Sequence, residues 1–365
     1  MVPPRPGAAM VSGGSLRRAT SKRRSNPHCP SSRSKPRHVR QRRGRSTMAH
    51  SHHVRHTCTV AAPAIVVYGL LADAPGWSRL FPSVVHAEPD PAEGGEDVLR
   101  LWTAADGGVD DVRVRLTPDP DALTLGFRYD DPRSPAAARS GTWRIRPAGG
   151  GCEVVFDQAY AAAGDDPERL AWLRAAAEAA AESGLESLKQ GAERAGRIGD
   201  VLLTFADELE IAAGPAAVHD FLWRAGGWAE RVPHVARAAL TEVSPRAQLL
   251  ELDTVLPDGS THTTESVRVR PGPGRIVSKR LRLPALLAAH LTEWSLTETA
   301  GGVRAVHRHT AVLRPEAVPD FLGAGATLAE ARAHVRKALG TTSRETLRCA
   351  RAAVTGAKEG LSAGR

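Results

Sequence analysis

The side chains of this chain best suited to chemistry are a serine, an arginine and three histidines. Ser266 and Arg268 fall two residues apart on a predicted strand, so strand alternation places both on one face. A hydroxyl and a guanidinium on one face can donate hydrogen bonds to an oxygen that gains negative charge during a reaction. His86, His234 and His290 add groups that exchange protons near neutral pH. These residue types favour acid–base and oxyanion chemistry.

The spacing of residues along the chain does not support other kinds of site. No G-x-G-x-x-G motif follows a predicted strand, no phosphate-binding loop appears, and no nucleophilic triad is indicated. The four cysteines have neither metal-ligand spacing nor the density of a disulfide scaffold. The spacing therefore predicts no metal site.

Simple patterning offers another interpretation of the arginines. Val267 and Val269 alternate with Arg268, and Arg113 and Arg115 alternate with apolar residues in the same way. A strand with this pattern turns its valines to the core and its arginines to water. From the pattern alone, a solvated face is the alternative to a site.

The elements that must position these residues occur twice. The block GWSRLFPSVVHA at 76–87 returns as GWAERVPHVARA at 227–238, an offset of 151 residues. The same offset of 151 aligns Trp143 with Trp294 and Gly150-Gly151 with Gly301-Gly302. Repeats of this length are whole domains rather than short solenoid units. The chain is therefore predicted to contain two copies of one fold.

Each copy follows the same predicted order of elements. The first begins with a strand over 56–62, a short helix and the Trp77 turn, continues with about six alternating strands, and ends in a long Ala/Glu/Leu-rich helix. The second repeats this order from about residue 203, and 196–202 forms a short link. This is an α+β order, in which each curved antiparallel sheet surrounds a long C-terminal helix and leaves a cavity. Within such a copy His307 and His309, on a late strand, are expected to face solvent.

The charge of the chain is concentrated at one end. Residues 1–47 contain thirteen Lys or Arg and no Asp or Glu, whereas the remainder carries a net charge of about −4. We expect a disordered basic extension over 1–50 and a disordered tail over 357–365. Met48 is a candidate true start of translation; a solvated tail and a nucleic-acid arm are the alternatives. The acidic remainder disfavours a folded nucleic-acid binder, and the absence of a long apolar run or secretory signal predicts a soluble cytoplasmic protein rather than a membrane protein.

The Trp turns carry a resemblance to a known family. The pattern G-W-x-x-x-x-P-x-V, the W-x-[IL] strands that close on Gly-Gly, LPALLAAH at 283–290 and the duplication resemble the helix-grip, or START-like, superfamily. More narrowly they resemble the di-domain aromatase/cyclases of bacterial type II polyketide synthases, over about residues 52–356. The resemblance implies tandem helix-grip domains at 52–196 and 203–356.

The resemblance also implies a reaction. The substrate would be a poly-β-ketone tethered to an acyl carrier protein, and the enzyme would close its first ring by aldol addition and dehydrate it to an aromatic ring. Neither a metal nor an organic cofactor is implied. The implied partners are a minimal polyketide synthase and, as an open alternative, a ketoreductase, and the protein would be a monomer or a weak dimer.

Site residues carry over unevenly from the family. Ser266 and Arg268 match its Ser-x-Arg pair, whereas in the first copy Arg115 would take the Arg place and Arg113 the Ser place. The Tyr expected after the Trp turn is a valine in both copies. His86 and His234 lie close to those positions and are the remaining candidates for proton transfer there.

The family's apolar pocket walls have counterparts as well. Implied lining residues are Trp77, Trp143, Trp228, Trp294 and His290. Core packing of the tryptophans and structural hydrogen bonds of the histidines are the plain alternatives. The rival function is a non-enzymatic tandem carrier for an apolar small molecule, whose pocket would be nearly all apolar.

Overall fold

The computed structural model describes residues 51–90, 98–105, 107–130, 136–162, 167–255 and 259–356. These residues fall within a single compact unit. The basic extension expected over 1–50 and the tail expected over 357–365 lie outside the described residues. No helix in the described ranges combines the length and the apolar character needed to cross a membrane.

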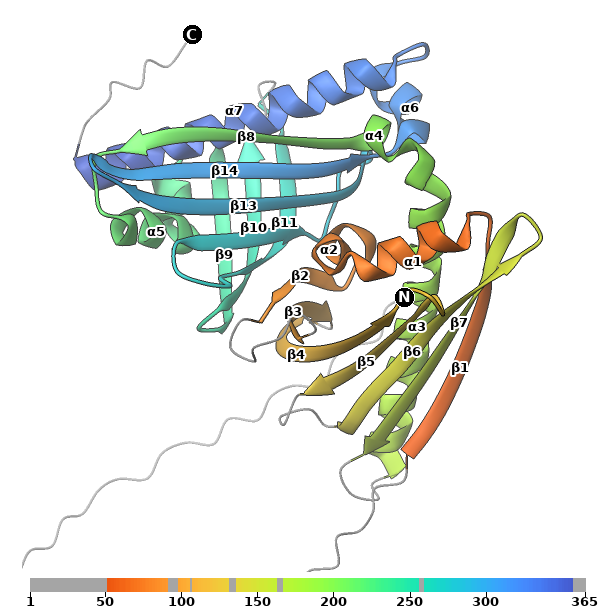
Figure 1. The fold of residues 1–365 in the computed structure, drawn as a ribbon. Helices are drawn as coiled ribbons and strands as arrows, with labels where there is room; N and C mark the ends of the chain where they lie inside the picture. The colour runs from red at the N-terminus through yellow and green to blue at the C-terminus, as the bar shows by residue number, and fades with distance from the viewer. Residues whose placement is uncertain are drawn as a thin grey trace, which may run out of the picture. The chain divides into compact units, whose positions relative to one another are not determined.

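The first repeat has the predicted order of elements (Figure 1). It consists of β1 (Ser51–Val60), α1 (Ala64–Ala72), η1 (Ala74–Gly76), α2 (Trp77–Leu80), β2 (Val84–Pro89), β3 (Val98–Ala105), β4 (Gly108–Asp119), β5 (Thr124–Asp130), β6 (Ala136–Ala148), β7 (Gly151–Ala162) and α3 (Pro167–Arg194). The strand expected over 56–62 begins earlier, at Ser51, because β1 pairs with β7 along its whole length.

The second repeat follows after a helical link formed by η3 (Ala195–Arg197) and α4 (Ile198–Val201). It consists of β8 (Leu202–Ile211), α5 (Pro215–Trp223), η4 (Ala225–Glu230), β9 (Val235–Ser244), β10 (Ala247–Val255), β11 (Thr261–Val269), β12 (Arg275–Arg280), β13 (Leu287–Thr299), β14 (Gly302–Leu313), η5 (Pro315–Ala317), α6 (Val318–Leu322) and α7 (Leu328–Thr355). The order of elements is that of the first repeat, with η5 and α6 added before the long helix.

Both sheets have seven antiparallel strands and the same topology. Their orders are β1-β7-β6-β5-β4-β3-β2 and β8-β14-β13-β12-β11-β10-β9. The long helix of each repeat packs on its sheet, α3 on β1 and β7 and α7 on β8 and β14 (Figure 1). We call the sheet face that meets the helix the interior face and the other the outer face. The predicted fold class, two tandem helix-grip domains, is confirmed.

Local sequence explains where the key elements begin and end. Helix α7 begins at a capping box, in which the Thr327 hydroxyl accepts from the Glu330 N–H and the Glu330 carboxylate accepts from the Thr327 N–H. It ends at Gly356, whose φ of 68° favours glycine. In the first repeat the Trp77 indole N–H donates to the Leu71 carbonyl at 3.0 Å, which ties the Trp turn to the end of α1.

The repeats meet through the outer faces of their sheets. Val85 and Trp102 of the first repeat form one buried cluster with residues of the second, namely Ala247, Val267, Val269 and Val277. Trp102 is completely buried, so this contact is as dry as a domain core.

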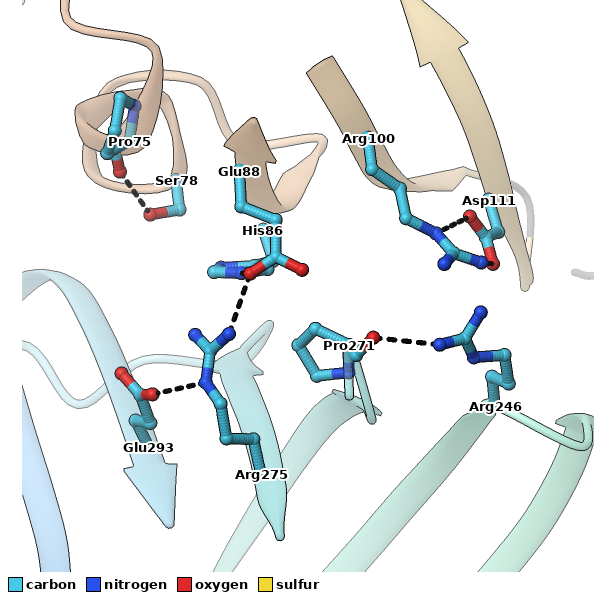
Figure 2. Close-up of polar contacts among 10 residues, drawn as sticks. All are labelled: Pro75, Ser78, His86, Glu88, Arg100, Asp111, Arg246, Pro271, Arg275 and Glu293. Carbon is cyan, nitrogen blue, oxygen red and sulfur yellow. Dashed lines mark hydrogen bonds and ion pairs between the residues drawn. The ribbon is translucent and has the colours of Figure 1, made fainter. Parts of the chain in front are cut away.

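Two polar contacts bracket this cluster. The Lys279 ammonium donates to the carbonyls of Phe81 at 2.6 Å and Val84 at 2.8 Å. At the other contact Arg275 binds Glu88 of the first repeat at 2.7 Å and Glu293 of its own sheet at 2.9 Å (Figure 2). A buried ammonium group whose partners lie in the other repeat makes the two folds interdependent.

We predict that Lys279→Ala lowers the free energy of unfolding by about 1–3 kcal/mol, because it leaves two buried carbonyls without their donor. The matched control is Arg128→Ala, the counterpart 151 residues earlier, whose side chain is 64% exposed. The control should change stability by no more than about 0.5 kcal/mol. Urea unfolding of both variants measures the difference; equal midpoints would contradict the role of Lys279.

The same residue predicts a pH dependence of stability. Burial lowers the pKa of Lys279 from 10.5 to about 7. Above that pH the unfolded chain holds a proton that the folded chain has released, so folding gains stability as pH rises towards 10.5. Relative to Lys279→Met, the wild-type free energy of unfolding should rise by up to about 1.4 kcal/mol per pH unit in this window. Thermal melts of both proteins between about pH 7 and pH 9 test this. A difference that stays constant across the window would contradict the lowered pKa.

Candidate active site

Strand register decides which residues of the two repeats are counterparts. Arg268 lies opposite Ser278 on the neighbouring strand, and Leu116 lies opposite Phe127. Phe127 and Ser278 are 151 residues apart, and the starts of β12, β13 and β14 keep this offset from those of β5, β6 and β7. The first-repeat counterpart of Arg268 is therefore Leu116, at an offset of 152, because one more residue separates the paired positions of β10 and β11 than separates those of β3 and β4.

This single residue corrects the prediction for Arg115 and Arg113. Arg115 is the counterpart of Val267 and lies on the outer face, where its guanidinium is 3.9 Å from the Asp130 carboxylate. Arg113 lies on the same face and donates to the buried Asp90 at 2.6 Å. A shift of one position along a strand exchanges interior for outer face, so neither arginine takes the place that the resemblance implied.

Arg268 is buried in the second repeat, with 2% of its surface exposed. Its guanidinium donates to the carbonyl of Trp223 and the side-chain oxygen of Gln248, both at 3.2 Å, and to the carbonyl of Leu222. The rings of Trp223 and Trp228 lie 5.4 and 5.7 Å from it. Burial lowers the pKa of Arg268 to about 9, which leaves it charged at neutral pH. The cation thus sits at the C-terminal end of α5, where the helix dipole favours it.

Ser266 shares the interior face with Arg268, as strand alternation predicted. Its neighbour on β12 is Arg280, a second arginine on this face. Burial lowers the pKa of Arg280 to about 10, so that it also stays charged at neutral pH. The interior of the second repeat therefore holds two guanidinium groups and a hydroxyl on adjacent strands.

Three imidazoles lie on the neighbouring strands of the same face. His290 Nε2 is 3.2 Å from His309 Nδ1, and His307 Nδ1 is 2.9 Å from the Ser343 hydroxyl on α7. The His307 ring stacks on Trp294 with 3.6 Å between ring centroids. Burial lowers the pKa of all three histidines, that of His309 to about 3, so they are neutral at physiological pH.

Five buried polar atoms of this face have no hydrogen-bond partner. They are Nδ1 of His290 and the Nε2 atoms of His307, His309, Gln248 and His262. Buried polar atoms are rarely left in this state unless water or a ligand satisfies them. Five on one interior face indicate a place for a ligand that carries several oxygen atoms.

The prediction that His307 and His309 face solvent was wrong, since they are 8% and 3% exposed. The sequence contained a signal that could have found them. The residues 151 positions earlier are Phe156, a core residue, and the buried Gln158. A histidine whose counterpart in the other repeat packs in the core is expected in the interior too.

The first repeat has the same frame with a less polar interior. The counterparts of Ser266, Arg268, Ser278, Arg280 and His307 are Val114, Leu116, Phe127, Tyr129 and Phe156, all of which belong to its core. Arg268 and His307 are thus replaced by leucine and phenylalanine. His56, with an unpartnered buried Nε2, and the buried Gln158 remain as polar groups of the first-repeat interior. The Ser-x-Arg pair and the cluster of three histidines therefore belong to the second repeat.

The four tryptophans anchor both repeats. Trp77, Trp143, Trp228 and Trp294 are between 4% and 9% exposed, and all lie in the core clusters. The Trp228 indole N–H donates to the Phe221 carbonyl at 3.1 Å. This hydrogen bond corresponds to the one between Trp77 and Leu71 in the first repeat. Trp228 and Trp294 also contact Arg268 and His307, so in the second repeat core packing and pocket lining coincide.

The histidines near the Trp turns have different surroundings. A bulge between Val84 and His86 turns His86 to the outer face, beside Glu88 (Figure 2). There its Nε2 is 3.0 Å from the Glu88 carboxylate, and its ring contacts that of Trp102. His86 therefore lies outside the interior of the first repeat, and its catalytic role stays a prediction. His234 is half-buried in the turn before β9, and burial lowers its pKa.

A metal centre is not among the arrangements that the structure displays. Within the described ranges no group of three or more His, Cys, Asp or Glu side chains could hold a metal ion. In the imidazole cluster, the facing nitrogens of His290 and His309 bond to each other.

Comparison with known proteins agrees with this geometry. Residues 51–193 match the family described as polyketide cyclase/dehydrase and lipid transport. The chain is 36% identical over 299 residues to a granaticin polyketide synthase bifunctional cyclase/dehydratase of Streptomyces violaceoruber, covering 81% of this chain and 92% of the relative. It is 36% identical over 312 residues to the corresponding actinorhodin protein of Streptomyces coelicolor, covering 83% and 96%.

Solved structures point the same way. The di-domain ARO/CYC BexL of the BE-7585A pathway has a TM-score of 0.76 at 39% identity, over 84% of this chain and all of the other. The di-domain ARO/CYC StfQ of the steffimycin pathway has a TM-score of 0.72 at 34% identity, over 83% and 98%. With its two helix-grip repeats and these full-length relatives, the chain belongs to the family of di-domain polyketide cyclase/dehydratases.

Proposed function

We propose that this chain is an aromatase/cyclase that closes the first ring of a carrier-bound poly-β-ketone by aldol addition and dehydrates it, and that the second repeat performs the chemistry. Support comes from one observation: the charged Arg268 shares a buried face with five polar atoms that lack partners. At the positions of Arg268 and His307 the first repeat has Leu116 and Phe156.

The aldol step would use the guanidinium groups. A carbon–carbon bond forms between the enol carbon of one β-ketone unit and the carbonyl carbon of another, and negative charge grows on the attacked oxygen. Arg268, Arg280 and the Ser266 hydroxyl are placed on adjacent strands to donate hydrogen bonds to that oxygen. Donors fixed in a dry site need no reorganisation when the charge appears, which is why such groups lower barriers. The same enclosure holds the chain in one folded shape.

The proton transfers would use the neutral imidazoles. His307 can accept a proton at one ring nitrogen while the other donates to Ser343, and the His290–His309 pair offers the same exchange. A coupled exchange of this kind avoids the buried imidazolium that the lowered pKa values disfavour. The final dehydration removes the new hydroxyl and an adjacent proton as water, and the product becomes aromatic.

The first repeat would support the site rather than duplicate it. Val85 and Trp102 pack on Val267 and Val269, the outward residues of the strand that carries Ser266 and Arg268. The rival function, a tandem apolar carrier, requires an apolar interior in both repeats. Since the second repeat buries Arg268 and three imidazoles, it does not meet that requirement, and we favour catalysis.

Finer features of the function rest on the family resemblance. They are tethering to an acyl carrier protein, cooperation with a minimal polyketide synthase or a ketoreductase, a cytoplasmic location, and a monomeric or weakly dimeric state. The regiochemistry of the ring is a matter for product analysis. Reconstitution with a minimal polyketide synthase and a ketoreductase, followed by chromatography of the products, tests the function as a whole.

We predict that Arg268→Gln lowers formation of the aromatised product by about 100-fold and diverts the chain to shunt compounds, because an oxyanion donor is lost. Arg115→Gln, on the outer face, should leave the products unchanged and serves as the control. Thermal melts show whether each variant is folded, since Arg268 also binds the end of α5. Wild-type products from a folded Arg268→Gln variant would remove this residue from the mechanism.

We predict that His307→Phe lowers aromatisation by about 100-fold or more while the protein stays folded. Phe156 stacks on Trp143 at 3.7 Å in the first repeat, so phenylalanine suits the position that stacks on Trp294. The control is His334→Phe, which removes an exposed imidazole from α7. If the initial rates of both variants match the wild type, His307 takes no part in proton transfer.

A further inference from the structure

A groove of about 670 Å³ lies at the edge of the second repeat's interior face, beside the start of α5. Its walls include His219, Arg246, Arg270, Leu296 and Glu298, together with the turn at 272–274. The proposed reaction uses none of these residues. The volume falls within the range of small-ligand sites.

Two guanidinium groups are held rigidly at this groove. Arg246 donates to the Pro271 carbonyl at 2.7 Å (Figure 2), and Arg270 donates through Nε to the Pro245 carbonyl at 2.9 Å. Each arginine thus fastens the turn from which the other arises. A guanidinium has five N–H donors, so these contacts leave donors for a ligand on both side chains.

The groove has an excess of positive charge. Across the described ranges, neither Arg246 nor Arg270 has a carboxylate within ion-pair distance, and Glu298 is the one acidic residue among the groove's walls. The groove of about 500 Å³ on the outer face of the first repeat differs in this respect. There Arg115 and Arg128 both lie within 4 Å of Asp130, at 3.9 and 3.4 Å.

One aromatic layer separates the groove from the interior. The Trp223 ring lies 4.9 Å from the Arg270 guanidinium on the groove side and 5.4 Å from that of Arg268 inside. His219, one helical turn before Trp223, stacks on it at 6.3 Å. A molecule bound in the groove is therefore adjacent to the end of α5, where Arg268 holds the backbone.

The charge belongs to the repeat with the polar interior. The first-repeat counterparts of His219, Trp223 and Arg270 are Tyr68, Ala72 and Pro118. The cationic groove therefore lies in the repeat that also buries Arg268 and three imidazoles. A ligand that needs both would carry an anionic group and an oxygen-rich chain.

We infer that this groove binds the phosphodiester of a carrier protein's pantetheine arm, while the attached polyketide enters the interior beside Trp223. Two fixed guanidinium groups match phosphate by geometry as well as by charge. The inference rests on the proposed function, since it supplies the docking point of the tethered substrate. It extends that function to residues outside the pocket.

Calorimetric titration of the full chain with 4′-phosphopantetheine and with pantetheine tests the inference. We expect the wild type to bind the phosphorylated compound at least tenfold more tightly. Arg246→Gln and Arg270→Gln, alone and combined, should each reduce this preference, and the double variant should abolish it. Arg128→Gln at the other groove should retain it. If the double variant fails to fold in thermal melts, the single variants decide.

The result separates the inference from the proposed function. A wild-type protein that cyclises a carrier-bound polyketide but binds both compounds equally would overturn the docking site and leave the function standing. A phosphate preference that survives in both single variants would likewise overturn the assignment to Arg246 and Arg270. Phosphate binding without any cyclisation would refute the function instead, and with it the substrate role of the groove.

Discussion

The whole arrangement depends on one strand that is buried on both faces. On β11, Ser266 and Arg268 point into the second repeat, while Val267 and Val269 pack against Trp102 of the first. A shift of one residue along this strand would turn Ser266 and Arg268 towards Trp102 and the valines into the polar interior, so the register is strongly specified. This constraint holds the guanidinium at a fixed depth, and it explains why two repeats are joined when one holds the polar groups.

Duplication has produced two interiors on one backbone. The first repeat keeps Leu116 and Phe156 where the second has Arg268 and His307, and the ring stacking on Trp143 and Trp294 is nearly the same. Burying arginine and imidazole with unsatisfied nitrogens costs stability. These polar groups lose their hydrogen bonds to water, and the protein replaces only some of them. An apolar repeat packed against the polar one can offset that cost. The two repeats therefore resemble one site with a supporting domain rather than two equivalent sites.

Each correction to the sequence-based predictions has a local physical cause. One additional residue between β10 and β11 moves Arg115 to the outer face, and a bulge does the same for His86. Each is a shift of one position along a strand. Because side chains alternate, a shift of one position moves a side chain to the other face of the sheet. His307 and His309 were predicted on the wrong face for a different reason. Alternation shows which residues share a face, but it does not show which face of the sheet meets the helix.

The amino-acid sequence by itself determined the duplication, the α+β order, the Trp anchors and the shared face of Ser266 and Arg268, because these follow from offsets and periodicity along one chain. It also indicated the family, through motifs whose spacing survives divergence. Only the tertiary structure decided which repeat is polar inside, which arginines are buried, and that Lys279 and Glu88 join the repeats. Those outcomes depend on which faces of two sheets meet, and contacts between residues nearly two hundred positions apart leave no periodic trace in the sequence.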